Sequence, residues 1–545
     1  MTEGKRRQEA ATLPDVLLAG ASDHPGRRAV VFPDASCNYR ELLDRARTVA
    51  AGLIASGIEP GRNVGLLAHN GVPFLAGLFG ISLAGCVVVP INARHRAKEI
   101  GYVARDAELA AVLTTSFAGE YASFTDIMVE AIPGLAGAAP DGPLDIADVP
   151  HLRLVALLEG EGRPGFVSQA EFQRRASSVA AGEAERRRDG IGGRDVAMIL
   201  YTSGTTADPK GCLLTHEGLT RGAIDRASRR FRTSDHDVAW NGGPLFHIAA
   251  FGPLIGSMGT GGTYLSDLYF EPTRAVALMR REGVTMAWPW FPAIVQRLLD
   301  QPDFNAANLP RLKKLMMIVP EALAERVRER FPDADIMQAC GMTETSGIFA
   351  VSTPDETWAE RATTQGKTEA GLECRIVDPE TLADLPDDRM GEIWVRGYCV
   401  TMGYHNAPAK TAEAITADGW LRTGDLYIRT PAGNLIFKGR HKDMLKVGGE
   451  NVAAIEVESF LCSHPAVRVA EVVGRPHPEL DEVPVAFVEL QPGASATAQE
   501  LIAFCQGRIA RYKIPVDVRF VEPDTWPMSA TKVNKRALRD TLVAS

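Results

Sequence analysis

The feature that most constrains this 545-residue chain is a short apolar run that ends in a loop of small and hydroxyl-bearing residues. The run, residues 196–201, is long enough for one buried strand. The loop follows as Thr202-Ser-Gly-Thr-Thr-Ala-Asp-Pro-Lys-Gly211. Backbone N–H groups in a glycine-containing loop, together with hydroxyls and a lysine, are suited to bind a polyphosphate. The stretch therefore predicts a strand leading into a phosphate-binding loop; a plain strand and turn is the alternative.

The spacing in this loop differs from the common nucleoside-triphosphatase loop, which reads Gly-x-x-x-x-Gly-Lys and then Ser or Thr. Lys210 lies at the matching distance from Gly204, but Pro209 and Gly211 replace the second glycine and the hydroxyl residue. The sequence therefore predicts a polyphosphate site of another type.

Helical and strand patterns alternate through residues 12–135. Residues 39–53 and 73–85 have the pattern of helices, whereas residues 64–68 and 87–90 read as strands. Alternation at this pitch is typical of βαβ units around a mostly parallel sheet. The predicted fold class is thus α/β for the large N-terminal part, residues 1–439.

Residues 440–545 are predicted to form a small α+β domain. Thr497 and Glu500 have capping-box spacing at the start of a helix that Pro515 ends. The expected elements are a helix over 452–462, strands over 467–473 and 483–490, and a helix over 497–511.

Local composition also predicts the secondary structure of four other stretches. Residues 134–165 are rich in Gly, Pro and Asp, and residues 186–193 are polar, so both are predicted to be loops. Residues 215–230 are predicted to be a helix, and residues 340–347 a loop of small and polar residues after a strand.

Composition excludes several classes of protein. The net charge of −9 argues against a general surface for nucleic acid or anionic membranes. No apolar stretch is long enough for a membrane-spanning helix, and the N-terminus lacks the pattern of a secretory signal. The 8 cysteines show no C-x-x-C spacing, which predicts reduced thiols in a cytoplasmic protein without zinc or disulfides.

Several loops that follow predicted strands resemble, in order and content, the adenylate-forming superfamily. That superfamily includes acyl- and aryl-CoA synthetases, peptide-synthetase adenylation domains and beetle luciferase. The resemblance runs from about residue 30 to residue 540. It rests on Tyr-Thr-Ser-Gly-Thr-Thr-x-x-Pro-Lys-Gly at 201–211, Gly-Met-Thr-Glu at 341–344, Gly-Trp-x-x-Thr-Gly-Asp at 419–425 and Gly-Arg-x-Lys-Asp at 439–443.

The resemblance implies an acyl-CoA synthetase with a large α/β domain and a small mobile C-terminal domain. Such an enzyme makes acyl-AMP and pyrophosphate from an acid and ATP, and a thiol then displaces AMP. The implied cosubstrates are ATP, Mg²⁺ and coenzyme A, with no prosthetic group, in fatty acid or other lipid metabolism. The expected partners are these small molecules, with neither nucleic acid nor stable membrane insertion, and a homodimer is an option.

The resemblance also implies roles for residues at the nucleotide. Thr343 corresponds to a phosphate-binding threonine and Glu344 to a magnesium ligand, in keeping with the hard oxygen ligands that Mg²⁺ prefers. Asp425 and Arg440 correspond to the residues that contact the ribose. The residues implied for the β- and γ-phosphates are Thr202, Ser203, Gly204, Thr205, Thr206 and Lys210.

The C-terminal region resembles the part of the family that changes between the two steps. Lys532 corresponds to the adenylation lysine, with Lys535 as the alternative because the loop is one residue short. Lys442 lies at the hinge position. The residues implied for the pantetheine tunnel and thioester formation are Lys446, Gly448 and Gly449.

Three departures from the family pattern lie near the nucleotide. Ala207 replaces a usual glycine, and Cys340 replaces the tyrosine that stacks on adenine. Residues 317–320, Met-Ile-Val-Pro, replace the usual Gly-Gly-Ala-Pro and, like residues 90–94, resemble the carnitine/crotonobetaine-CoA ligase branch. These changes are expected to raise the KM for ATP or relax nucleotide choice.

The acid pocket is expected beside residues 246–262, 288–292 and 338–347, where no lysine or acid stands out. An apolar acyl, aryl or alicyclic acid is therefore predicted. The pocket residues named for it are Phe246, Phe251, Trp288, Trp290 and Gly341, with His247 at the family's gating position. An acyl-AMP ligase that loads a carrier protein is one alternative, and a degenerate nucleotide-binding or scaffold protein is another.

Overall fold

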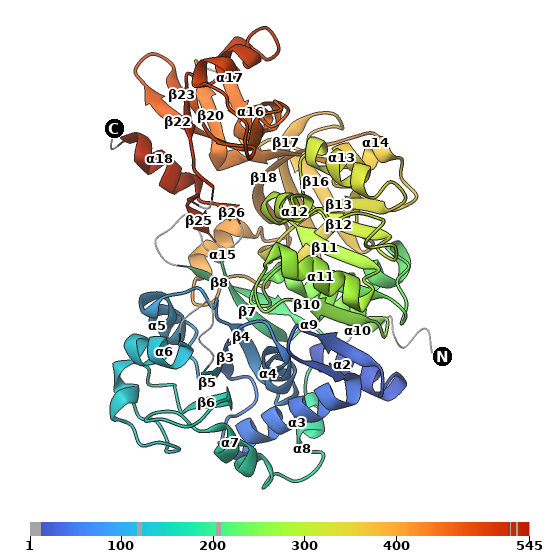
Figure 1. The fold of residues 1–545 in the computed structure, drawn as a ribbon. Helices are drawn as coiled ribbons and strands as arrows, with labels where there is room; N and C mark the ends of the chain where they lie inside the picture. The colour runs from blue at the N-terminus through green and yellow to red at the C-terminus, as the bar shows by residue number, and fades with distance from the viewer. Residues whose placement is uncertain are drawn as a thin grey trace.

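The computed structural model describes residues 12–116, 123–202, 209–448, 450–523, 525–529 and 532–543. A large α/β N-terminal domain carries a smaller C-terminal domain of mixed sheet and helices, drawn in orange and red in Figure 1. The predicted α/β class and the two-domain organisation are confirmed.

The first sheet of the large domain contains the strand that leads into the predicted phosphate loop. Its strands run in the order β6-β5-β3-β4-β7-β8 and are parallel except for the β7–β8 hairpin. Helices α3 (Tyr39–Ala55) and α4 (Val72–Leu83) pack against each other beside this sheet. The strands are β3 (Asn63–Leu67), β4 (Val87–Pro90), β5 (Ala111–Thr115), β6 (Leu154–Glu159), β7 (Val196–Thr202) and β8 (Lys210–Thr215).

The second sheet has the order β15-β14-β13-β12-β11-β9-β10-β1-β2, with parallel pairing from β1 through β13. A third, antiparallel sheet follows in the order β16-β17-β18-β19. The strands of the second sheet are β1 (Arg28–Val31), β2 (Ser36–Asn38), β9 (Val238–Asn241), β10 (Thr263–Ser266), β11 (Met286–Trp290), β12 (Lys314–Met317), β13 (Asp335–Met342), β14 (Gly347–Val351) and β15 (Lys367–Thr368); those of the third are β16 (Leu372–Val377), β17 (Met390–Gly397), β18 (Leu421–Arg429) and β19 (Leu435–Arg440).

The small domain is built on the sheet β21-β20-β23-β22, to which β24 adds beside β23. The predicted capping box at Thr497 and Glu500 forms and begins α17. In Figure 1 the β25–β26 hairpin lies between the two domains. The elements are β20 (Met444–Val447), β21 (Glu450–Ala453), α16 (Ala454–Leu461), β22 (Val467–His477), β23 (Asp481–Leu490), α17 (Ala498–Cys505), β24 (Asp517–Phe520), β25 (Met528–Ser529), β26 (Lys532–Val533) and α18 (Lys535–Val543).

Four local predictions need correction, and in two of them, residues 134–165 and 340–347, long-range strand pairing outweighs local composition. The predicted loop 134–165 contains β6, which pairs with β5, and 186–193 includes the end of helix α8 (Glu183–Asp189). The predicted helix 215–230 divides into α9 (His216–Asp225) and the π-helical turn η2 (Arg226–Arg230). The predicted loop 340–347 continues β13 to Met342 before the turn η4 (Thr343–Thr345).

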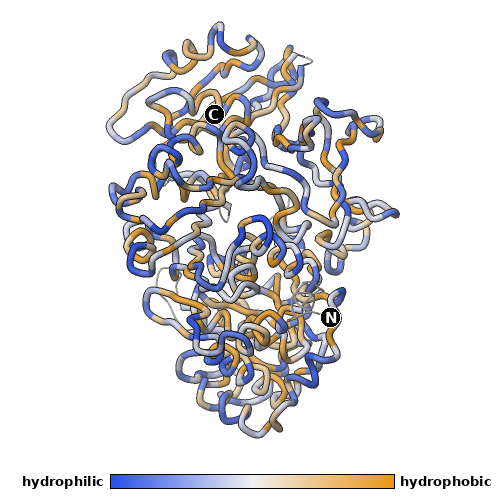
Figure 2. The backbone as a smooth tube through the Cα atoms, turned by 90° about the vertical axis from the view of Figure 1, so that its right-hand side faces the viewer, coloured by the Kyte–Doolittle hydropathy of each residue, from blue (hydrophilic) through white to orange (hydrophobic). Residues whose placement is uncertain are grey.

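Figure 2 shows hydrophobic stretches of backbone running through the interior of the large domain. They match the extended cluster of buried side chains around α3, α4 and the first sheet. Among the described helices, none is both long and apolar enough to cross a membrane.

Candidate active site

One large cavity, of about 3630 Å³, is bordered by both domains. The third sheet, the adjoining ends of β7 and β8 and the turn after β13 supply one part of its lining, and α16, β22 and α18 supply another. The motifs that were predicted to bind the nucleotide therefore meet at one place. The members of the lining that matter below are Lys210, Thr343, Glu344, Asp425, Arg440 and Lys535.

Lys210, the first residue of β8, lies close to the turn η4, which begins with Thr343. Thr202 and Lys210 are partners in the β7–β8 pairing, so the ends of the phosphate loop are held together. Lys210 Nζ lies 5.2 Å from the centre of the Tyr404 ring, and the Tyr404 hydroxyl donates to Glu344 Oε1 at 3.1 Å. Thr343 is buried beside Glu344 and lines the cavity. Tyr404 was missed because no sequence pattern links residue 404 to the phosphate loop.

Four of the predicted phosphate residues, and one departure from the family pattern, lie outside the described residues. They are Ser203, Gly204, Thr205, Thr206 and Ala207.

The predicted ribose residues lie opposite each other on neighbouring strands. Asp425 on β18 is the register partner of Arg440 on β19, and Asp425 Oδ1 lies 3.2 Å from Arg440 Nε. Lys442 follows directly in the turn η5 (His441–Asp443) and also lines the cavity. Partial burial, followed by the nearby Arg440 charge, lowers the pKa of Lys442. This corner of the cavity therefore holds two acids, Asp425 and Asp443, and two cations, Arg440 and Lys442.

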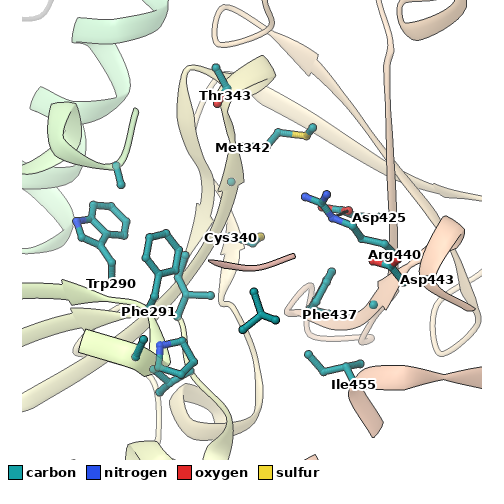
Figure 3. Close-up of a pocket in the computed structure, with 18 of the residues that line it drawn as sticks. Trp290, Phe291, Cys340, Met342, Thr343, Asp425, Phe437, Arg440, Asp443 and Ile455 are labelled. Carbon is teal, nitrogen blue, oxygen red and sulfur yellow. Dashed lines mark ion pairs between the residues drawn. The ribbon is translucent and has the colours of Figure 1, made fainter. Parts of the chain in front are cut away.

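Cys340 lies between two groups of lining side chains (Figure 3). Its side chain is buried, which raises the thiol pKa, and the Tyr427 hydroxyl hydrogen-bonds to it. The ring of Phe437 packs 5.3 Å from the Tyr427 ring, centre to centre. In Figure 3 Trp290 and Phe291 lie on one side of Cys340, and Phe437, Asp425 and Arg440 lie on the other.

Sequence reasoning missed Phe437 and Tyr427. Both line the cavity and together offer aromatic surface near the Asp425–Arg440 pair. Alternating apolar residues in β19 are the ordinary pattern of a strand, so Phe437 carried no separate signal.

In the small domain, the two candidate lysines lie in neighbouring elements, β26 and α18. Lys532 is in β26, and its neighbour Val533 lines the cavity. Lys535 Nζ is bound to Glu458 Oε1 and lies 3.5 Å from Glu471 Oε2. Burial and the nearby Glu458 raise the pKa of Glu471 to about 8. Lys535 is therefore engaged by two carboxyl groups of its own domain.

The two described tunnel residues, Lys446 and Gly448, do not line this cavity. Lys446 and Gly448 are exposed at the β20–β21 hairpin, and Gly448 has a φ of 59°, a conformation that favours glycine. Gly449 lies outside the described residues.

At the acid end, the structure brings together part of the predicted pocket. Phe246, His247, Trp290 and Gly341 line the cavity. A Cβ added to Gly341 would lie 2.1 Å from the carbonyl oxygen of Gly347, so this position excludes any side chain. His247 Nδ1 accepts from the Ala249 N–H at 3.2 Å.

Two predicted pocket residues, Phe251 and Trp288, are not part of the described lining and pack into apolar clusters instead. A charged side chain from outside the three expected segments also borders the cavity. Arg226 lines the cavity there and pairs with the buried Glu369. Sequence reasoning missed this pair because its members are 143 residues apart.

The carboxylate of Glu344 fits magnesium bound together with ATP. Within the described part of the chain, no group of three or more His, Cys, Asp or Glu side chains is placed to hold a metal alone. Mg²⁺ usually keeps several waters and binds through one or two carboxylates plus substrate phosphates. A single half-buried glutamate beside Lys210 matches that mode of binding.

Comparisons with known proteins agree with this arrangement. The profile of AMP-binding enzymes matches residues 18–405, and that of the AMP-binding enzyme C-terminal domain matches residues 456–532. The methyl-dioxo-octahydroindenyl-propanoyl:CoA ligase of Mycobacterium tuberculosis is 33% identical over 535 residues, covering 97% of this chain and 98% of that protein. The mitochondrial medium-chain acyl-CoA ligase ACSF2 of Homo sapiens is 28% identical over 560 residues, covering 99% and 88%.

A solved structure extends the likeness to the whole fold. ATP-bound MatB from Rhodopseudomonas palustris superposes with a TM-score of 0.83 at 26% identity, covering 97% of this chain and 98% of that chain. The chain therefore belongs to the family of AMP-binding enzymes, and within it to the AMP-forming acid–CoA ligases.

Proposed function

We propose that this acid–CoA ligase activates a largely apolar carboxylic acid inside the cavity between its domains. A carboxylate oxygen attacks the α-phosphorus of ATP, and pyrophosphate leaves. The thiolate of coenzyme A then attacks the acyl carbonyl carbon, and AMP leaves with the oxygen that bridged the two. The observation that carries the proposal is that one cavity holds Lys210, Thr343 and Glu344 together with the Asp425–Arg440 pair.

The phosphate end would stabilise the leaving pyrophosphate. Lys210 and Thr343 would contact the β- and γ-phosphates, because a cation and a hydroxyl there offset the charge that develops on the leaving group. Glu344, oriented by the Tyr404 hydroxyl, would hold Mg²⁺, which draws charge from the phosphate oxygens when bound. Thr202 and the residues from Ser203 to Thr206 remain predicted phosphate ligands.

The adenosine would lie between the third sheet and β13. The Asp425 carboxylate can accept from both ribose hydroxyls, and Arg440 can donate to the same ribose. Phe437 offers an aromatic face at this end of the cavity, which supports a role in stacking on adenine in place of the tyrosine that Cys340 replaces. The base would thus lie on an aromatic surface supplied by another strand.

The arrangement of the small domain supports Lys532 as the adenylation lysine. Val533, next to Lys532, lines the cavity, whereas Lys535 is bound by Glu458 and Glu471. The exposed position of Lys446 supports a second arrangement for thioester formation. A rotation near Lys442 would convert the arrangement for adenylation into the arrangement for thioester formation. Residues 1–439 and 440–545 would be the two domains that move relative to each other.

The acid class rests on the pocket and on the relatives. Phe246, Trp290, Phe291 and Ile248 supply an apolar lining. The relatives are named for medium-chain acids and for a ring-bearing propanoate, which supports an apolar chain or alicyclic acid here. His247 would gate this end. Cytoplasmic location and a homodimer remain predictions from the sequence.

A screen across carboxylic acids tests the proposed function. Purified enzyme with ATP and Mg²⁺ should release pyrophosphate only when an accepted acid is present, and addition of coenzyme A should yield AMP and acyl-CoA in equal amounts. Pyrophosphate release without any acyl-CoA would favour an acyl-AMP ligase that loads a carrier protein. No release with any acid would favour the degenerate nucleotide-binding protein.

A further inference from the structure

A buried ion pair stands at the inner end of the acid pocket. Arg226 Nε donates to Glu369 Oε1 at 2.9 Å, and Arg226 Nη2 lies 3.4 Å from Glu369 Oε2. Their side chains are only 5% and 4% exposed. Burying two charges is costly even when they pair, and apolar residues of similar size often stabilise a protein as well or better. Stability alone therefore does not explain why the chain has this buried ion pair, and a role in function is expected.

One face of α9 leads from the phosphate end of the cavity to this pair. Gly218, Gly222, Ala223 and Arg226 all line the cavity at helical spacing. A Cβ added to Gly218 would lie 2.6 Å from the Oγ of Ser346, which is two residues after Glu344 in the sequence. At 1.5 Å per residue, Arg226 lies about 12 Å further along the helix axis. It begins the π-helical turn η2, a type of distortion that is frequent at functional sites.

The guanidinium of Arg226 keeps one nitrogen available to the cavity. Within the described residues, no acceptor is hydrogen-bonded to Nη1. A Cβ added to Gly252 would lie 3.9 Å from Nη1 and 3.9 Å from the Trp290 ring. A Cβ on Gly222 would lie 3.1 Å from Glu369 Oε2 and 3.0 Å from Tyr398 Oη. Two glycines thus leave space directly over the ion pair.

The neighbourhood contains a second donor. The indole N–H of Trp288 is buried and has no hydrogen-bond partner among the described residues. Trp288 lies behind Gly252 and lines a small second cavity that shares Ala223 and Gly252 with the large one. Arg226 Nη1 and the Trp288 indole thus both carry N–H groups that have no hydrogen-bond acceptor among the described residues.

We propose that the acid carries a neutral carbonyl oxygen, such as a ketone, at the end far from its carboxylate, and that Arg226 Nη1 donates to this oxygen. A guanidinium offers five N–H donors and no acceptor, so it selects for acceptors. Glu369 already neutralises its charge, so a second carboxylate would be buried without a net positive partner. This proposal deepens the proposed function and rests on it.

The preference can be measured on the wild-type enzyme. The probes are three saturated acids of equal length: an unsubstituted acid, the same acid with a ketone near the far end, and the corresponding dicarboxylic acid. We expect kcat/KM for acyl-CoA formation to be about 10- to 100-fold higher for the oxo acid than for the unsubstituted acid. A preference for the unsubstituted or the dicarboxylic acid would overturn the proposal.

A paired variant then assigns the preference to these residues. Arg226→Leu together with Glu369→Leu removes both charges, so neither is left buried alone. In the double variant the ratio of oxo acid to unsubstituted acid should fall to about one or below. An unchanged ratio in a variant that still makes acyl-CoA would contradict the role of Arg226, and a misfolded variant would leave the wild-type comparison as the deciding result. Failure of all acids to give pyrophosphate would instead refute the proposed function.

Discussion

Replacement of Phe437 by leucine tests how this enzyme holds adenine without the usual tyrosine. Phe437 is half-buried, lines the cavity and is braced by the Tyr427 ring at 5.3 Å, so its exposed face has a fixed orientation. Stacking of a base on an aromatic ring contributes about 1–3 kcal/mol, and leucine keeps some apolar contact. A loss of about 1–2 kcal/mol corresponds to a KM for ATP raised about 5- to 30-fold.

The assay is pyrophosphate release at a saturating acid concentration with ATP varied. Phe520→Leu serves as the matched control, because Phe520 is 45% exposed on β24 and does not belong to the described cavity lining. Cys340→Tyr should lower the KM for ATP and should offset part of the loss when combined with Phe437→Leu. An unchanged KM for ATP in Phe437→Leu would refute the role of Phe437, and an unchanged KM in Cys340→Tyr would refute the idea that Cys340 weakens nucleotide binding.

Three further predictions follow from other parts of the structure. Tyr404→Phe removes the hydrogen bond to Glu344 and should lower the adenylation rate about 10- to 100-fold, as measured by burst kinetics at varied Mg²⁺; an unaltered rate would contradict the role of Tyr404. Lys532→Ala should abolish adenylation yet spare thioester formation from supplied acyl-AMP, whereas Lys535→Ala should chiefly lower the melting temperature; the reverse pattern would make Lys535 the adenylation lysine. Burial lowers the pKa of His216 from 6.5 to about 4, so the unfolded chain takes up the proton first as the pH falls. The free energy of unfolding should therefore fall by up to about 3 kcal/mol between pH 6.5 and 4, measured by urea unfolding, and His216→Gln should flatten this dependence.

The fold could be predicted from the sequence where local pattern and tertiary structure agree. The alternation of apolar strands and amphipathic helices predicted the parallel sheet, and β3 and β4 lie within one residue of the expected ranges. The capping box at Thr497 formed, although the helix ends at Cys505 and not near residue 511. The prediction of a loop over 340–347 was wrong for the first residues of that stretch. Its small polar residues are typical of a loop, but pairing between β13 and β14 holds the first of them in a strand.

The candidate site was predictable only in part, for a physical reason. Motif residues such as Lys210 and Asp425 carry their signal in a short local pattern, and the structure places both on the cavity. Arg226 and Glu369 have no such local pattern around them, because an ion pair between residues 143 positions apart depends on how distant strands and helices pack. Phe437 likewise became informative only when its strand β19 was paired with β18, which carries Asp425 and Tyr427.

The central claim, that the acid oxygen attacks the α-phosphorus and AMP later leaves, is tested most directly with an acid whose carboxylate oxygens carry the heavy isotope. After turnover with ATP, Mg²⁺ and coenzyme A, we expect one heavy oxygen in AMP, one in the acyl-CoA and none in pyrophosphate. Heavy oxygen in orthophosphate or pyrophosphate, or unlabelled AMP alongside the thioester, would contradict it.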